Sequence, residues 1–234
     1  MALINLLKEE TVENTEIVIA ALNEEIGVAL TIKEMSETLS TNRITVVDGR
    51  SIDRTVEIAK DLGAYILYQD GFGKGDAIMK AIEFLQPESE YVVFTDADFT
   101  YPAEHVSKMI EILEQEKQVG MVCGNRLEGN LDRKALKSQF YFGNKLLAFA
   151  HNLFNGVDLK DPLTGLRVVR AEILRNWCMK SRGVDVEVEL NAEVLKQGLS
   201  IVEIPINYRE RVGEKKLKMK HGVTILKRIF LEAF

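Results

Sequence analysis

The chain has 234 residues, 46% of them hydrophobic and 28% charged, which is the composition of an ordinary globular domain that can bury a full core. Its net charge of -6 is uneven: residues 207–234 hold eight Lys and Arg against three Asp and Glu, whereas the rest holds 22 against 33. The acidic body argues against nucleic-acid binding, and the basic end indicates either contact with phosphates on a ligand or membrane, or a merely solvated tail.

The N-terminal sequence differs from a secretory signal, because MALINLLKEETVENTE has no basic leader and only a short apolar run. No run of 18 apolar residues occurs, so no spanning helix is expected. Cys123 and Cys178 lie far apart in apolar surroundings and fit neither a disulfide framework nor a paired-thiol metal motif. We therefore expect two buried free thiols and a cytoplasmic protein, with residues 1–15 as a lead segment.

Short apolar runs rich in β-branched residues alternate with segments of helical period along the first half of the chain. This alternation predicts β-α-β units, and hence a single α/β domain with a Rossmann-like, mostly parallel sheet flanked by helices. The strands are expected at 16–20, 43–48, 64–68, YVVFTD ending at 96, and 119–124, and the helices at 24–39, 53–61, 74–85 and 103–116.

The pattern changes after the fifth of these strands. A polar stretch, 125–137, leads into SQFYFGNKLLAFAHNLF, whose apolar positions suit an amphipathic helix that is either core or an apolar binding surface. An apolar run at 166–169, a helix at 185–196 and a strand at 200–206 follow. The final segment, HGVTILKRIFLEAF, forms an apolar helical stripe that suits either an interfacial helix on anionic headgroups or a helix packed on the domain.

Two carboxylates follow the strand YVVFTD. Asp96 and Asp98 lie on one side of the chain, because alternate residues of an extended segment share a face. In parallel sheets ligands collect at the carboxyl ends of the strands. A hard divalent cation such as Mg²⁺ or Mn²⁺, shared with substrate phosphate oxygens, neutralises such a pair well. Taken alone, Asp-Ala-Asp equally begins an ordinary turn.

Other strand ends carry polar residues too. Glu24 follows the first strand, and Asp48 follows the second, where it can accept hydrogen bonds from a base or ribose. Asp53 fits a helix cap better than a ligand contact. The segment DGFGKGDA lacks the spacing of a phosphate-binding P-loop, although its Lys74 can still reach a nucleotide.

Together these segments resemble the family-2 inverting glycosyltransferases of GT-A fold, and within them the dolichyl-phosphate (polyprenyl-phosphate) mannose or glucose synthases. The resemblance covers residues 16 to 226, with a GT-A domain at 16–220 and an amphipathic helix at 221–234. It rests on seven segments in order: IVIAALNEE, VVDGRSIDRT, GKGDAI, FTDADFTYP, GNRL, DPLTGLRVVR and YRERVGEKKLKMKHG.

The resemblance implies a nucleotide-sugar donor, GDP-mannose or UDP-glucose, bound with Mg²⁺ or Mn²⁺. The implied donor contacts are Ala20, Leu22, Glu24, Asp48, Lys74, Asp96, Ala97, Asp98, Arg211 and Lys216. The implied metal ligands are Asp96, Asp98 and Thr100, and the implied catalytic residues are Asp96, Asp98, Arg126 and Arg211. The chain departs from the family at Ala20, usually Pro, at Leu22, often aromatic, and at Thr100, often Gln.

The same resemblance implies a polyprenyl-phosphate acceptor, held by Arg126, Arg133 and Ser138. An Arg fork matches a phosphate monoester in shape and charge, although Arg133 is alternatively plain surface charge. Such a phosphate is already ionised near neutral pH, so transfer with inversion needs no general base. The enzyme would act as a peripheral protein at the cytoplasmic face of a membrane, and a membrane protein is a candidate binding partner.

Two alternatives remain open at this stage. With a hydroxyl acceptor the same fold would need a base, for which Asp161, Asp185 and Glu187 are the candidates; for the last two the alternative is electrostatic stabilisation of a helix start. A non-catalytic nucleotide-sugar-binding subunit is the other alternative, and the intact Asp96 and Asp98 argue against it.

Overall fold

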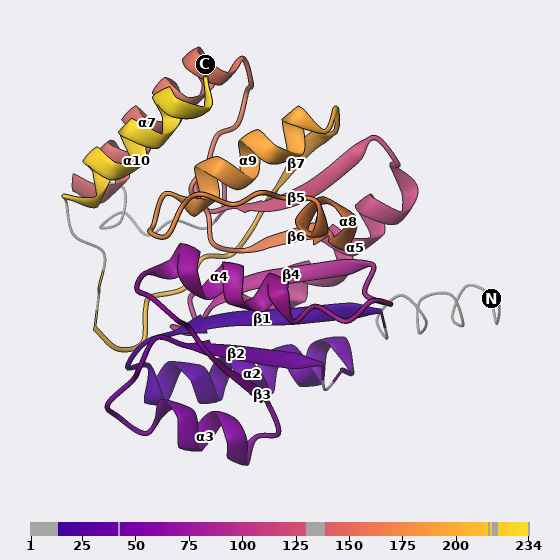
Figure 1. Cartoon of the computed structure of the whole chain (residues 1–234), viewed down its shortest axis with the longest axis vertical. Coiled ribbons are helices and arrows are strands. Elements are labelled where there is room, and N and C mark those ends of the chain that lie inside the picture. Colours follow the sequence, from indigo (N-terminus) through magenta and orange to yellow (C-terminus); the bar gives the residue numbers. More distant parts are fainter. Residues whose placement is uncertain (1–13, 42, 130–138, 215, 217–219, 234) are drawn as a thin grey trace.

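The computed structural model describes residues 14–41, 43–129, 139–214, 216 and 220–233. Within them one seven-stranded sheet has the order β3-β2-β1-β4-β6-β5-β7, and only β6 runs antiparallel to its neighbours (Figure 1). The mostly parallel α/β sheet expected from the sequence is therefore confirmed. The strands are β1 Thr15–Ala21, β2 Ile44–Asp48, β3 Tyr65–Tyr68, β4 Tyr91–Asp96, β5 Val119–Asn125, β6 Arg167–Arg170 and β7 Ser200–Pro205.

Helices cover both faces of the sheet. Because successive strand residues point to opposite faces, Ile17 and Ile19 of β1 join the core under one set of helices, and Val18 joins the core under the other. The first set is α2 (Glu25–Leu39), α3 (Thr55–Asp61) and α5 (Val106–Gln115), the last preceded by a 3₁₀ turn at Ala103–His105. The second set is α4 (Lys74–Glu83), α8 (Ala171–Arg175) and α9 (Val186–Lys196).

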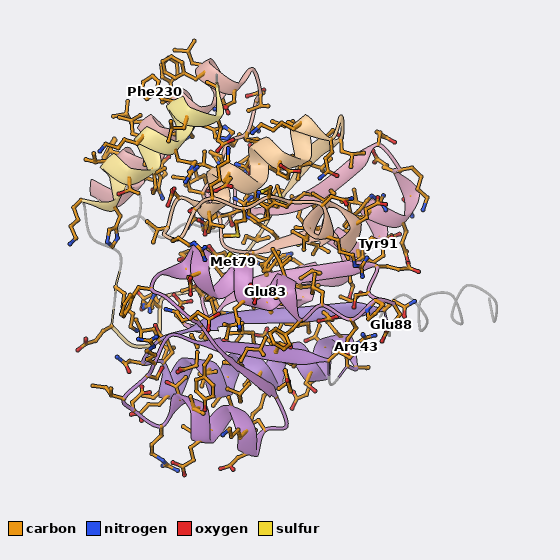
Figure 2. All side chains as sticks on the ribbon, viewed as in Figure 1. Arg43, Met79, Glu83, Glu88, Tyr91 and Phe230 are labelled. Carbon is orange, nitrogen blue, oxygen red and sulfur yellow. The ribbon has the colours of Figure 1, made fainter. Side chains whose placement is uncertain are left out.

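Two further helices, α7 (Gln139–Asn155) and α10 (His221–Glu232), lie side by side at one corner of the molecule (Figure 1). Phe154 of α7 packs on Phe230 of α10, with ring centroids 4.4 Å apart. Figure 2 labels Phe230 on this outer helix pair. Ile225 and Ile229 of α10 are buried against Val188 of α9. The last helix thus packs on the domain along one face, while Phe230 and Leu231 remain exposed on it.

The two cysteines differ in exposure. Cys123 is buried in β5, but Cys178 is exposed, so the prediction of a buried thiol was wrong for Cys178. The reason is local: Cys178 follows the short helix α8, which the sequence pattern did not reveal and which leaves the chain at the surface.

The predicted acceptor residues Arg133 and Ser138 lie outside the described residues. None of the described helices is long and apolar enough to cross a membrane.

Candidate active site

The candidate site lies at the carboxyl ends of β1, β2 and β4. β1 is paired with β2 on one side and with β4 on the other, so that Ala21 lies opposite Asp48 and Ala20 lies opposite Asp96. The two carboxylates therefore flank the end of β1, where a doubly wound sheet binds its ligands. Ala20 is half-buried between them, and Leu22, one residue beyond β1, is exposed. Arg43, Glu88 and Tyr91, labelled in Figure 2, lie at the opposite ends of these strands, where β2 and β4 begin.

Asp98 is held in the turn that follows β4. Thr100 donates to its Oδ1 from the backbone N (3.2 Å) and from Oγ1 (2.6 Å), and the intervening Phe99 has a φ of 63°. Burial raises the pKa of the Asp98 carboxyl, and the nearby Asp96 raises it further. The buried Ala97 brings β4 close to α2, where a Cβ on Gly27 would lie 2.4 Å from the Ala97 carbonyl oxygen. Thr100 therefore contacts Asp98 directly, and its role as a metal ligand stays a prediction.

The basic segment near the C-terminus lies over these carboxylates. Arg211 donates from Nη1 to Asp98 Oδ2 (2.5 Å) and from Nη2 to Glu24 Oε1. Lys216 donates to Glu24 Oε1 (2.5 Å) and to the carbonyl oxygen of Asn23 (3.0 Å). Burial raises the pKa of Glu24 in spite of these two cations. Three segments far apart in the chain thus meet at one cluster of opposite charges.

A second arginine, which the sequence analysis did not single out, anchors the same segment. Arg209 forms a two-pronged ion pair with Glu34 of α2 (2.6 and 2.7 Å), and its guanidinium lies 4.4 Å from the centroid of Phe99. Its backbone N donates to the carbonyl oxygen of Thr100 (3.0 Å). No local sequence signal pairs residues this far apart. Arg209 fixes the segment that carries Arg211 next to the Asp98 turn.

Lys74, the first residue of α4, links Asp96 to a different part of the fold. Its Nζ lies 2.6 Å from Asp96 Oδ1 and 2.8 Å from Glu187 Oε1, in the first turn of α9. Burial alone would lower the pKa of Lys74, but the two carboxylates outweigh it and hold the pKa above its ordinary value. Asp96 is also closely packed, since a Cβ on Gly165 would lie 2.5 Å from Asp96 Oδ2.

Asp48 has one carboxylate oxygen in use and one free. Its Oδ2 accepts from the backbone N of Arg50 (2.9 Å) and of Ser51 (3.0 Å), whereas its Oδ1 is buried and has no partner among the described residues. A buried acceptor without a partner is costly, so it suits a donor group of a ligand. Asp53 instead accepts from the backbone N of Thr55 (3.0 Å), the first residue of α3, and from that of Glu25 (3.2 Å), the first residue of α2, while Arg54 occupies the N-cap position of α3.

Each of the three residues weighed as a general base faces a cation. Asp161 accepts two hydrogen bonds from the Arg126 side chain, both 2.7 Å long. Asp185 pairs with Arg228 of α10 (2.8 Å), and Glu187 pairs with Lys74. The described part of the chain therefore offers none of these three as an unpaired base.

The residues that could hold a metal ion are hard oxygen donors. Among the described residues no group of three or more His, Cys, Asp or Glu side chains is arranged to hold one. The like charges of Asp96 and Asp98 nevertheless repel each other, and the charge of Asp96 raises the pKa of Asp98. Lys74 pairs with Asp96, and Arg211 pairs with Asp98. Mg²⁺ in proteins is commonly bound by one or two carboxylates together with substrate phosphates, and this pair fits that arrangement.

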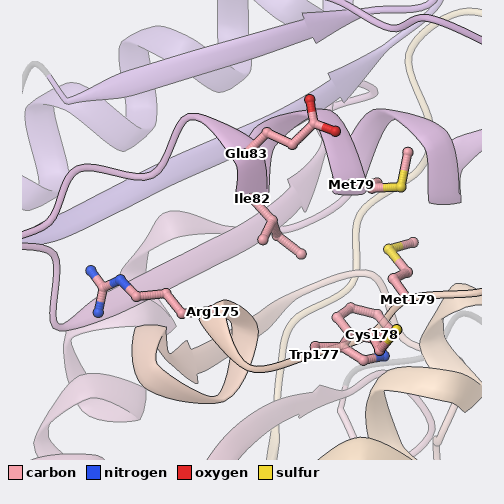
Figure 3. A pocket seen from close by; sticks show the side chains of 7 residues that line it. All are labelled: Met79, Ile82, Glu83, Arg175, Trp177, Cys178 and Met179. Carbon is pink, nitrogen blue, oxygen red and sulfur yellow. The ribbon is translucent and has the colours of Figure 1, made fainter.

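A hollow of about 450 Å³ elsewhere is not part of this site. It lies between α4 and the segment after α8, and Figure 3 shows Met79, Met179 and Cys178 among the side chains that line it. None of the predicted site residues lines it. The hollow therefore contributes no side chain to the candidate site at the strand ends.

Comparisons with known proteins place this geometry in a family. The model of glycosyl transferase family 2 matches residues 16–177. A dolichyl-phosphate hexose transferase from Haloferax volcanii is 31% identical over 214 residues, covering 90% of each chain. A low-salt glycan biosynthesis hexosyltransferase of the same organism is 32% identical over 86% of this chain, which spans only about half (49%) of that relative.

Solved structures agree with the fold. A glucosyl-3-phosphoglycerate synthase from Mycobacterium tuberculosis, crystallised with Mn²⁺, UDP-glucose and phosphoglyceric acid, superposes with a TM-score of 0.75. The two chains are 19% identical, and the match covers 94% of this chain and 79% of that one. This likeness shows the GT-A fold alone. With the family model matching most of its length, the chain belongs to glycosyltransferase family 2.

Proposed function

We propose that this protein transfers a hexose, with inversion, from a nucleotide-sugar donor to a polyprenyl phosphate. The observation that carries the proposal is the cluster of carboxylates at the strand ends that Arg211 and Lys216 face, together with Arg126, which Asp161 fixes at the carboxyl end of β5. The relative from Haloferax volcanii named dolichyl-phosphate hexose transferase supports the acceptor class. GDP-mannose and UDP-glucose are the two donors to test.

The donor would occupy the cluster between the end of β1 and the basic segment. Asp48 Oδ1 is buried with no partner among the described residues and would accept a hydrogen bond from the nucleoside. Arg211 and Lys216 now neutralise Glu24 and Asp98, and would turn to the diphosphate when the donor binds. Charge-assisted hydrogen bonds from cations to phosphate oxygens are among the stronger polar contacts in proteins.

Asp96 and Asp98 would hold Mg²⁺ or Mn²⁺, with Thr100 orienting the Asp98 carboxylate. When bound, the cation supplies positive charge for the departing nucleoside diphosphate. Lys74 would remain beside Asp96 and keep the local charge balanced. The metal-bearing structural relatives support this assignment at the level of the fold.

The acceptor would bring its own negative charge. Since Asp161, Asp185 and Glu187 are each paired with a cation, a hydroxyl acceptor would find none of them free to remove its proton. A phosphate monoester oxygen is already ionised near neutral pH, so it attacks the anomeric carbon while the bond to the diphosphate oxygen breaks. A single displacement of this kind inverts the anomeric configuration.

The test compares two acceptors that differ only in the phosphate. Purified protein receives a labelled donor, Mn²⁺, and either a polyprenyl phosphate or the matching free polyprenol. We expect labelled product only with the phosphate, and we expect Asp98→Asn to abolish it while Asp70→Asn, at an exposed aspartate, does not. Transfer to the free alcohol at a similar rate would refute the acceptor assignment.

We also propose that α7 and α10 rest on the lipid surface that contains the acceptor. On α7, Phe142, Leu146, Phe149 and Leu153 follow each other at helical spacing, with exposed fractions of 63–68%. Leu231 of α10 is likewise 68% exposed. Exposed apolar stripes of this size mark interaction surfaces. The exposed lysines of the same helices, Lys145 and Lys227, suit anionic headgroups.

Flotation with vesicles of anionic phospholipid tests this surface. The double variant Leu146→Ser and Phe149→Ser should lose most of the vesicle-bound fraction, since each buried apolar side chain contributes about 1.5–3 kcal/mol. The control is Tyr65→Ser, which removes an aromatic side chain of 60% exposure from β3, at the other edge of the sheet. Equal binding by all the proteins would contradict the assignment.

A further inference from the structure

Asp161 is a buried carboxylate that one cation engages through both of its oxygens. It is 1% exposed, and both of its oxygens accept hydrogen bonds from Arg126. Oδ2 accepts from the backbone N (3.0 Å) and from Nε (2.7 Å), and Oδ1 accepts from Nη2 (2.7 Å). This two-pronged geometry fixes the plane of the guanidinium as well as its position.

Asp161 is itself fixed from β7. Glu203 accepts from the backbone N of Asp161 (2.7 Å) and from that of Lys160 (2.7 Å). β7 pairs in parallel with β5, the strand that ends immediately before Arg126. Arg126 therefore follows directly on β5, and the loop residue that holds it is tied to the neighbouring strand β7 through Glu203. Hydrogen bonds from a strand residue limit the movement of that loop residue.

One aromatic ring lies over the guanidinium, and a second ring packs against the first. The Tyr208 ring centroid lies 5.5 Å from Arg126 Cζ, and the Tyr101 ring lies 5.3 Å from that of Tyr208. Of the three guanidinium nitrogens, Nε and Nη2 are thus engaged by Asp161, whereas Nη1 has no hydrogen-bond partner among the described residues. Arg126 presents this one nitrogen from an otherwise immobilised group.

We infer that Asp161 is a positioning residue, which holds Arg126 so that its Nη1 binds an oxygen of the acceptor phosphate. The inference rests on the proposed function and deepens it, because it assigns Asp161 to acceptor binding and removes it from the bases that a hydroxyl acceptor would need. Fixing a donor in advance lowers the cost of binding and of charge development during transfer.

The experiment uses Asp161→Asn in the full chain. Loss of the carboxylate charge should raise KM for a polyprenyl phosphate by roughly tenfold to a hundredfold, the range for a hydrogen bond to a charged group. The shape of the pH profile of kcat and the Kd of the nucleoside diphosphate with Mn²⁺ should stay as in wild type. Asp158→Asn, at an exposed aspartate of the same loop, is the matched control and should leave KM unchanged.

A double-mutant cycle with Arg126→Ala separates positioning from a general structural role. If Asp161 acts through Arg126, Asp161→Asn should add almost nothing to the KM of Arg126→Ala. The inference would be overturned if the effects of the two substitutions on KM were additive. It would also be overturned if Asp161→Asn lowered kcat, left KM unchanged and removed the fall of kcat at low pH. Should Asp161→Asn not fold, Glu203→Gln weakens the same support, and an unchanged KM there would equally contradict it.

Direct binding distinguishes failure of this inference from failure of the proposed function. Titration with a short prenyl monophosphate measures acceptor binding without turnover, and Asp161→Asn should weaken it by the same factor as it raises KM. If wild type uses the lipid phosphate but Asp161→Asn binds it equally well, the positioning role is refuted alone. If wild type neither binds nor uses a prenyl phosphate, both proposals fall.

Discussion

Lys74→Gln tests whether the buried ion pairs around Asp96 are arranged as described. Lys74 Nζ lies within 2.8 Å of both Asp96 and Glu187, whose side chains are 30% and 9% exposed. Removing one partner of a buried pair costs about 3–5 kcal/mol, because a charge is left uncompensated. Since Asp96 is partly exposed, we expect a loss of about 3 kcal/mol of unfolding free energy, measured by urea denaturation at pH 7.

The matched control is Lys80→Gln on the same helix. Lys80 also faces two carboxylates, Asp70 at 2.9 Å and Glu83 at 3.3 Å, but these are 72% and 48% exposed. Solvent and salt screen exposed pairs, so the unfolding free energy of this variant should stay close to that of wild type. Adding Glu187→Gln to Lys74→Gln should restore part of the loss, because one uncompensated carboxylate is removed. Equal losses for Lys74→Gln and Lys80→Gln would refute the reasoning.

Three further predictions concern single residues. Burial lowers the pKa of His151 to about 4, so at pH 5 the imidazole is protonated in the unfolded chain but not in the folded one. The wild type should therefore lose about 2 kcal/mol of unfolding free energy between pH 7.5 and pH 5, whereas His151→Gln should not lose this amount; urea denaturation at both pH values measures it. Gly165→Ala places a Cβ 2.5 Å from Asp96 Oδ2, so it should cost about 1–3 kcal/mol in the same assay; an unchanged midpoint would contradict this. A maleimide should label Cys178 in the native protein but Cys123 only after unfolding, because Cys123 is buried and its pKa is raised to about 11. Mass spectrometry counts the adducts, and two adducts on the native chain would contradict this prediction.

Much of the fold could be predicted because it depends on local pattern. The run YVVFTD is apolar and β-branched before its acidic end, so it identified both a buried strand and the position of Asp96 and Asp98. The helix predicted from residue 74 does begin there, as α4, after Gly73 with a φ of 95°. The hydrogen bond of Asp53 to the start of α3 likewise depends on neighbouring residues.

The partners of the site residues could not be predicted, because they depend on strand order. β6 lies between β4 and β5 and runs antiparallel to both, which brings the segment before it next to both strand ends. For this reason Asp161 meets Arg126, and Gly165 meets Asp96. Glu187 was weighed only as a base or as helix-start electrostatics, and its pairing with Lys74 needs the packing of α9 against the sheet.

Transfer of a labelled hexose into an organic-extractable lipid tests the central claim most directly. GDP-mannose and UDP-glucose are supplied separately with Mn²⁺, vesicles and a polyprenyl phosphate. The proposed function predicts label in the organic phase with one of the two donors, dependent on the divalent cation and abolished by EDTA. Label that stays in the aqueous phase with both donors, while the protein binds the nucleoside diphosphate, would contradict it.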